Sequence, residues 1–153
     1  MIPFTKNLFV VGAITETNRN TEIEICKYIP QGENKIIVEF GMGHGNITRE
    51  ILNNISCTSK VFGFEVNKDF CKQVESEISD SRLVIINDGA ENIKKHTNEN
   101  INSVIGSIPF SFFSKEKGMG IIQDSSDKLV DNAYFSQVLY IKFNFKKFEQ
   151  IFN

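Results

Sequence analysis

A hydrophobic segment that runs directly into a glycine-rich turn constrains the fold of this chain more than any other feature. Residues 35–48 read KIIVEFGMGHGNIT, so a short run rich in β-branched residues is followed by Gly41, Gly43 and Gly45. Apolar residues then recur at helical spacing over 46–55. The pattern predicts a strand, a turn whose backbone lies very close to another group, and a helix.

The same alternation of strand and helix continues along the chain. The predicted strands are 36–40, 61–65, 83–86, 101–105 and 134–143. The predicted helices are 22–29, 46–55, 68–78, a short one near 91–96, and one inside 114–130. This spacing favours right-handed crossovers and a parallel sheet covered on both faces. With no repeat or linker in the sequence, we expect a single three-layer α/β domain over residues 1–153.

Charge and cysteine content narrow the range of functions. The 17 Lys and Arg residues against 19 Asp and Glu give a net charge of −2, which does not support a nucleic-acid partner held through phosphates. Three cysteines and two histidines without a CxxC pair indicate neither a disulfide framework nor a metal site. The apolar run at 8–14 is too short to span a bilayer, and no cleavage signal follows it. A cytoplasmic location is therefore expected.

The glycines indicate a ligand at the end of the first predicted strand. In doubly wound sheets, ligands bind outside the carboxyl ends of the strands where strand order reverses. Gly41 and Gly43 are expected at positive φ, with Gly45 allowing the next helix to pack tightly. The dinucleotide pattern G-x-G-x-x-G and the P-loop pattern both fail. The remaining pattern, E-x-G-x-G-x-G, begins at Glu39, whose carboxylate would repel a pyrophosphate but suit the ammonium and sulfonium of S-adenosylmethionine.

Acidic residues at the next two strand ends point to a nucleoside. Glu65 closes the second predicted strand, where a carboxylate accepts hydrogen bonds from both ribose hydroxyls. Asp88 follows the third strand, where it would accept from an adenine amine while Gly89 lets the base lie against the chain. Each acid alone is equally well explained as a turn residue or a helix cap. Three acids at three consecutive strand ends favour the nucleoside.

Residues 36–110 resemble a class I S-adenosylmethionine-dependent methyltransferase, on the glycine motif and the two later acids together. The resemblance implies S-adenosylmethionine as the cofactor and a cofactor site assembled from three motifs. Its residues would be Glu39, Gly41, Met42, Gly43, Gly45, Glu65, Val66, Asp88 and Gly89.

The end of the fourth predicted strand, GSIPF at 106–110, resembles the substrate-side motif of ribosomal RNA adenine dimethylases and phospholipid N-methyltransferases. The dimethylases carry Asn where this chain has Ser107, and the VGAI segment at 11–14 is more similar to the phospholipid branch. We therefore expect N-methylation of an amine on a lipid head group or small molecule. The catalytic residues would be Ser107, which with the carbonyls around Ile108 accepts amine hydrogen bonds, and Phe110, which holds the head group.

Two other functions remain open: RNA adenine N-methylation, and a truncated, non-catalytic module that only binds S-adenosylmethionine. His44, inside the glycine turn, is interpreted as a tolerated exposed residue rather than a base. A methyl-transfer assay separates the enzyme from the binding module.

The C-terminal part raises a question about the edge of the sheet. The resemblance implies two further strands after the fifth, yet only about ten residues follow Phe143. We therefore expect the strand at 134–143 to be an exposed edge that is either unstable or covered, by a second copy of the chain or by a missing piece of the natural chain. The tail at 143–152 places apolar residues on one helical face and lysines opposite. It is interpreted as a helix covering the sheet, with peripheral membrane contact as the alternative.

Overall fold

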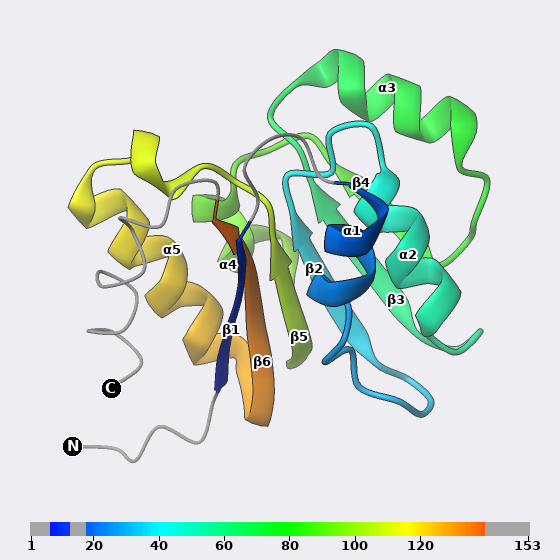
Figure 1. Ribbon diagram of the computed structural model, residues 1–153, viewed down its shortest axis with the longest axis horizontal. Helices are drawn as coiled ribbons and strands as arrows, with labels where there is room; N and C mark the ends of the chain where they lie inside the picture. Colours follow the sequence, from blue (N-terminus) through cyan, green and yellow to red (C-terminus); the bar gives the residue numbers. More distant parts are fainter. Residues whose placement is uncertain (1–6, 13–17, 140–153) are drawn as a thin grey trace.

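The computed structural model describes residues 7–12 and 18–139, with side-chain surroundings from residue 18 onward. Six strands form one sheet in the order β1-β6-β5-β2-β3-β4, and every neighbouring pair is parallel (Figure 1). The strands are β1 (Asn7–Gly12), β2 (Ile36–Phe40), β3 (Lys60–Phe64), β4 (Leu83–Ile86), β5 (Ile101–Gly106) and β6 (Leu129–Leu139).

Helices cover both faces of the sheet, with α1 to α3 on one side and α4 and α5 on the other (Figure 1). The helices are α1 (Arg19–Ile25), α2 (Asn46–Asn54), α3 (Lys68–Glu77), α4 (Ile93–His96) and α5 (Lys115–Lys128), with single 3₁₀ turns η1 (Ala90–Asn92) and η2 (Phe110–Phe112). Along β2, Ile37 packs with α1 and α2, whereas Val38 and Phe40 pack with α4 and α5. A strand buried on both faces is typical of a parallel sheet. The predicted three-layer α/β fold is confirmed.

Strand order reverses beside β2. From β2 the chain proceeds outward to β3 and β4, and β5 then returns to the other side of β2. Phe40, the last residue of β2, pairs with Phe64 of β3 and with Gly106 of β5. The loops that follow β2 and β5 therefore leave the sheet side by side and diverge. Such a reversal is where open α/β sheets form their ligand-binding crevice.

The sixth strand, β1, was not predicted, and it changes the edge of the sheet. It pairs in parallel with β6 along its whole length, from Asn7 opposite Tyr134 to Gly12 opposite Leu139. The expectation that the fifth predicted strand is an exposed edge is therefore wrong for the described residues, because β6 lies between β5 and β1. From the sequence, the apolar run at 8–14 was considered as a membrane segment and its VGAI part as a family resemblance, but not as a strand of the sheet. Its partner lies more than a hundred residues away in the sequence, so no local pattern reveals the pairing.

The first helix and the last strand differ most from the predicted bounds, and the helix ends at Ile25 instead of residue 29. The first helix begins at Arg19 instead of residue 22, because the Asn18 side chain accepts a hydrogen bond from the Thr21 amide and caps the helix. The last strand begins at Leu129 instead of residue 134, and it contains an irregularity opposite the Ile101–Ser103 segment of β5. Residues 140–143 and the predicted tail helix at 143–152 lie outside the described residues. Within the described part, no helix is long and apolar enough to cross a membrane.

Candidate functional site

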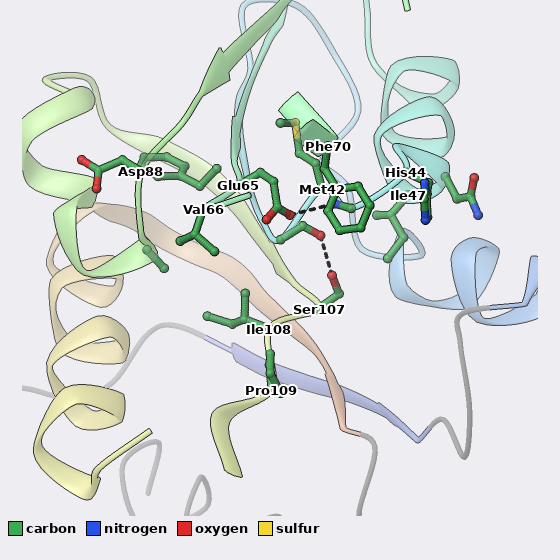
Figure 2. Close-up of a pocket in the computed structure, with 15 residues that line it drawn as sticks. Met42, His44, Ile47, Glu65, Val66, Phe70, Asp88, Ser107, Ile108 and Pro109 are labelled. Carbon is green, nitrogen blue, oxygen red and sulfur yellow. Dashed lines mark hydrogen bonds between the residues drawn. The ribbon is translucent and has the colours of Figure 1, made fainter. Parts of the chain in front are cut away.

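A cavity of about 410 Å³ opens at the carboxyl ends of β2, β3, β4 and β5 (Figure 2). Seven of the predicted site residues line it: Gly41, Met42, Gly43, Glu65, Val66, Asp88 and Ser107. Eight lining residues were not predicted: His44, Asn46, Ile47, Phe64, Phe70, Ala90, Ile108 and Pro109. Four predicted residues, Glu39, Gly45, Gly89 and Phe110, are not part of the cavity wall.

The glycine turn has the predicted backbone conformation. Gly41, Gly43 and Gly45 have φ of 82°, 51° and 80°, a region in which an ordinary residue is strained by about 1–2 kcal/mol. The neighbours differ: a Cβ atom would lie 3.0 Å from Ile108 at Gly41 and 3.0 Å from Ile78 at Gly45, but no atom lies within 4 Å at Gly43. The absence of a side chain at Gly41 and Gly45 therefore lets Ile108 and Ile78 pack closely against the turn, whereas Gly43 faces open space.

Glu65, which directly follows β3, is fixed against this turn. One carboxylate oxygen accepts a hydrogen bond from the Gly43 amide at 2.9 Å (Figure 2). The other accepts from the Asn67 amide at 2.8 Å. A carboxylate oxygen can accept two hydrogen bonds. Each oxygen of Glu65 therefore keeps one acceptor position, on a side chain whose orientation is already set.

Glu39, at the end of β2, is buried next to the turn instead of lining the cavity. Its side chain is 1% exposed, one carboxylate oxygen accepts from the Thr48 hydroxyl at 2.7 Å, and the other has no partner among the described residues. Burial raises the pKa of this carboxyl to about 7, although the Thr48 hydrogen bond acts in the opposite direction. An incompletely satisfied acid therefore lies behind the glycine turn.

Asp88 lies at one end of the cavity and its carboxylate already has three partners. One oxygen accepts from the Gly89 amide and the Asn92 side chain, and the other accepts from His96 Nε2 at 2.7 Å. These hydrogen bonds, that of His96 foremost, lower the pKa of Asp88 to about 2. Gly89 is covered by the side chain of Glu91 instead of facing the cavity.

The segment after β5 is tied to the glycine turn and to β6. The Ser107 hydroxyl donates to the Gly41 carbonyl at 2.7 Å (Figure 2). The carbonyl of Ile108 accepts from the Phe110 amide and from the side chain of Gln137, which is fully buried in β6. Two donors saturate that carbonyl. The Ile108 carbonyl therefore cannot accept a further hydrogen bond from an amine. Of the two predicted hydrogen-bond acceptors, only the Ser107 hydroxyl remains available in the cavity wall.

Phe110 is partly buried and does not line the cavity. Its ring lies against the core cluster on the α4 and α5 side and meets Phe113 edge to face, with ring centroids 5.6 Å apart. Pro109 lines the cavity in its place. Of the loop that the sequence motif predicted, Ser107, Ile108 and Pro109 line the cavity and Phe110 does not.

His44 lines the cavity and connects the glycine turn to α3. Its Nδ1 lies 3.0 Å from the Gln73 amide oxygen, while Arg49 donates both to the His44 carbonyl and to Glu77, which also accepts from Gln73. The His44 ring packs edge to face on Phe70, another wall residue. The four polar residues form a closed circuit. Because His44 and Arg49 lie more than twenty residues from Gln73 and Glu77 in the sequence, no local pattern predicted these hydrogen bonds.

The comparisons with known proteins agree with this architecture at the level of the fold. No family model and no curated protein matches the sequence. Solved structures do match, and they define a class: the fold is that of S-adenosylmethionine-dependent methyltransferases.

Three of these structures show the range within that class. The rRNA methylase from Streptococcus thermophilus has a TM-score of 0.67 at 18% identity, over 86% of this chain and 76% of its own. The S-adenosylmethionine-dependent O-methyltransferase from Thermotoga maritima has a TM-score of 0.73 at 16% identity, over 88% and 49%. The phosphoethanolamine N-methyltransferase 1 from Haemonchus contortus, in complex with phosphoethanolamine and S-adenosylhomocysteine, has a TM-score of 0.64 at 15% identity, over 76% and 24%. The acceptors of these proteins differ, so the fold alone does not select one.

Proposed function

We propose that this chain binds S-adenosylmethionine and transfers its methyl group to an amine on a lipid head group or small molecule. The observation that carries the donor is the pairing of Gly43 with Glu65. A glycine that faces open space adjoins a carboxylate with one remaining acceptor position on each oxygen, and both line one cavity. Two neighbouring acceptor positions suit the two hydroxyls of a ribose.

The rest of the cavity fits the other parts of the donor. Asp88 lies at the end of the cavity opposite His44, where the adenine would be placed beyond the ribose (Figure 2). On the other side of Glu65, the donor's cationic part would lie over the glycine turn, near the buried acid Glu39 with its unpartnered oxygen. A cation there stabilises the ionised form of Glu39, which burial otherwise disfavours.

Ser107 supports an amine as the methyl acceptor. A serine hydroxyl has one proton, and that of Ser107 is donated to the Gly41 carbonyl. Toward the cavity, Ser107 can therefore only accept a hydrogen bond, which an amine N–H supplies. Because Gly41 belongs to the donor's turn, this hydrogen bond also sets the acceptor position relative to the donor.

Methyl transfer requires mainly that the amine lone pair is aligned with the methyl–sulfur bond of the donor. When bound, the donor supplies an electrophilic methyl group on a sulfonium sulfur. The chain's own part is to orient the amine lone pair through Ser107, to hold the donor through Glu65, and to exclude water with Ile108 and Pro109. None of these residues becomes covalently modified.

The test is transfer of a labelled methyl group from S-adenosylmethionine to three acceptors: phosphatidylethanolamine vesicles, a single-stranded adenine-containing RNA, and a pool of small amines. We expect label in the vesicles or the small amines. Ser107→Ala should lower the transfer rate about tenfold or more while changing the donor Kd only a few fold. If binding of S-adenosylhomocysteine is absent in calorimetry, the proposed function is wrong; binding without transfer to any of the acceptors would favour the non-catalytic module.

RNA adenine is the second candidate, and likeness to the rRNA methylase fold is the observation that favours it. Two features count against it: the net charge of −2, and the position of the Phe110 ring, which packs against the core cluster and is not part of the cavity wall. Label that appears in the RNA alone would establish this candidate in place of the first.

A further inference from the structure

His96 lies beside the end of the cavity at which the proposed function, on which the role inferred for His96 rests, places the adenine. Asp88 is the residue expected to meet the adenine. Counting its hydrogen bonds shows how much of it remains available: one oxygen has two donors, Gly89 and Asn92, and the other has only His96. With two acceptor positions on each oxygen, one position remains, on the oxygen that His96 holds.

The two sets of partners differ in origin. Gly89 and Asn92 lie in the turn that directly follows Asp88, so they hold the first oxygen locally. His96 ends α4, eight residues further along the chain, and it is the described partner of the second oxygen. The orientation of the oxygen that is still free to bind therefore depends on His96.

The His96 ring contacts Phe64, a residue of the cavity wall. The two rings meet edge to face, with centroids 5.7 Å apart and planes at 80°. Phe64 is a fully buried wall residue whose ring also packs edge to face on Phe40 of β2. The ring contact fixes where His96 lies, and its Nε2–H fixes where the Asp88 oxygen points.

The remaining acceptor position has a defined chemical preference. The low pKa of Asp88 keeps the carboxylate ionised at neutral pH, so it accepts hydrogen bonds and donates none. The exocyclic amino group of adenine supplies an N–H there, whereas the carbonyl oxygen of hypoxanthine would be repelled. A base with a 6-amino group should therefore be selected over one with a 6-oxo group.

We propose that His96 is a positioning residue for base selection: its Nε2–H holds the free oxygen of Asp88 in the orientation that accepts the 6-amino group of adenine. His96 does not contact the donor in this arrangement. It acts through Asp88, and its ring contact with Phe64 is a separate, structural role.

Calorimetry with two ligands and two substitutions separates these roles. The ligands are S-adenosylhomocysteine and S-inosylhomocysteine, which differ at the 6-position and adjacent N1 of the purine. His96→Gln keeps an N–H donor and loses the ring. His96→Phe keeps a ring against Phe64 and loses the donor. Lys95→Gln, at an exposed neighbouring position of α4, is the control.

In the wild type and in the control we expect S-adenosylhomocysteine to bind about tenfold or more tightly than S-inosylhomocysteine. The preference should persist in His96→Gln and fall to about threefold or less in His96→Phe. If thermal melting shows that His96→Phe does not fold, His96→Leu removes the same donor and replaces it.

The outcomes are distinguishable. If the wild type binds neither ligand, the proposed function is wrong and this inference with it. If it binds both equally, or if His96→Phe keeps the full preference, the inference is overturned while the proposed function stands. Loss of the preference in His96→Gln but not in His96→Phe would show that the ring, not the donor, is responsible.

Discussion

At the scale of single residues, the three acids at consecutive strand ends have three different environments. Glu39 is buried and incompletely paired, Glu65 is held by backbone amides, and Asp88 is surrounded by donors. The sequence pattern assigned each a different ligand contact but did not show how deeply each is buried or how it is paired. Their environments set their chemistry, because burial raises the pKa of Glu39 while hydrogen bonds lower that of Asp88.

The first prediction concerns Glu39 and pH. Its folded-state pKa of about 7 exceeds the ordinary value of 4.5, so the folded state holds this proton more tightly than the unfolded chain. The resulting stabilisation is complete below about pH 4.5 and is lost as pH rises through about 7. Glu39→Gln cannot titrate there. Between pH 4.5 and pH 7, the free energy of unfolding of the wild type, measured in urea, should fall by about 2–3 kcal/mol relative to that of the variant. If the two free energies change in parallel with pH, the pKa of Glu39 is not raised.

The second prediction concerns Glu65. Glu65→Gln replaces one acceptor oxygen by an amide N–H, which must then face the Gly43 or the Asn67 amide or the ligand. We expect the Kd for S-adenosylhomocysteine to rise about tenfold or more, with little change in melting temperature. Glu75→Gln, on the exposed side of α3, is the matched control. An unchanged Kd in Glu65→Gln would place the ribose elsewhere.

At the scale of elements, the segment after β5 depends on a close contact between β5 and β6. Gly106 pairs with Gln137, and a Cβ atom at Gly106 would overlap the Gln137 amide oxygen. Glycine at this position lets the buried Gln137 side chain reach the Ile108 carbonyl and hold the acceptor side of the cavity. The loop that carries Ser107 is thus positioned from β6.

The third prediction compares two glycines. Gly106→Ala should displace Gln137 and destabilise the fold by about 1–3 kcal/mol, whereas Gly120→Ala, inside α5 with no atom within 4 Å of its Cβ position, should stabilise it by about 0.5–1 kcal/mol. Denaturant unfolding of the pair measures both. Equal effects of the two substitutions would mean that Gln137 moves aside freely.

The sequence predicted the features that depend on neighbouring residues, and it missed those that depend on contacts between distant elements. The strand, glycine turn and helix at 36–54 were predicted within one residue, because hydrophobic periodicity and positive-φ glycines are local. The hydrogen bonds of His96 to Asp88 and of Gln137 to the Ile108 carbonyl were not predicted, because they join different elements. Phe110 was predicted in the site but does not line the cavity: it begins the η2 turn and packs partly against the core cluster, which no local pattern shows.

At the scale of the whole molecule, β1 replaces the strand that was expected to be missing. The predicted fold left the last strand with an unpaired edge of apolar residues, a feature that promotes association. In the structure the N-terminal segment β1 pairs there, and among the described residues β1 is the outermost strand on that side. The proposed second copy of the chain is therefore not needed to pair the described part of β6.

The last prediction concerns the pairing of β1 with the edge of β6. Deleting residues 1–12 removes β1 and exposes the β6 edge from Tyr134 to Leu139, next to the buried core residues Phe135 and Val138. We expect faster hydrogen exchange of the β6 amides that pair with β1, a lower melting temperature, and concentration-dependent association in light scattering. As a control, truncation before residue 7 keeps β1 and should keep the β6 amides protected. If the longer deletion leaves β6 protection and the monomeric state unchanged, β1 contributes nothing to closing the sheet, and another segment must cover that edge.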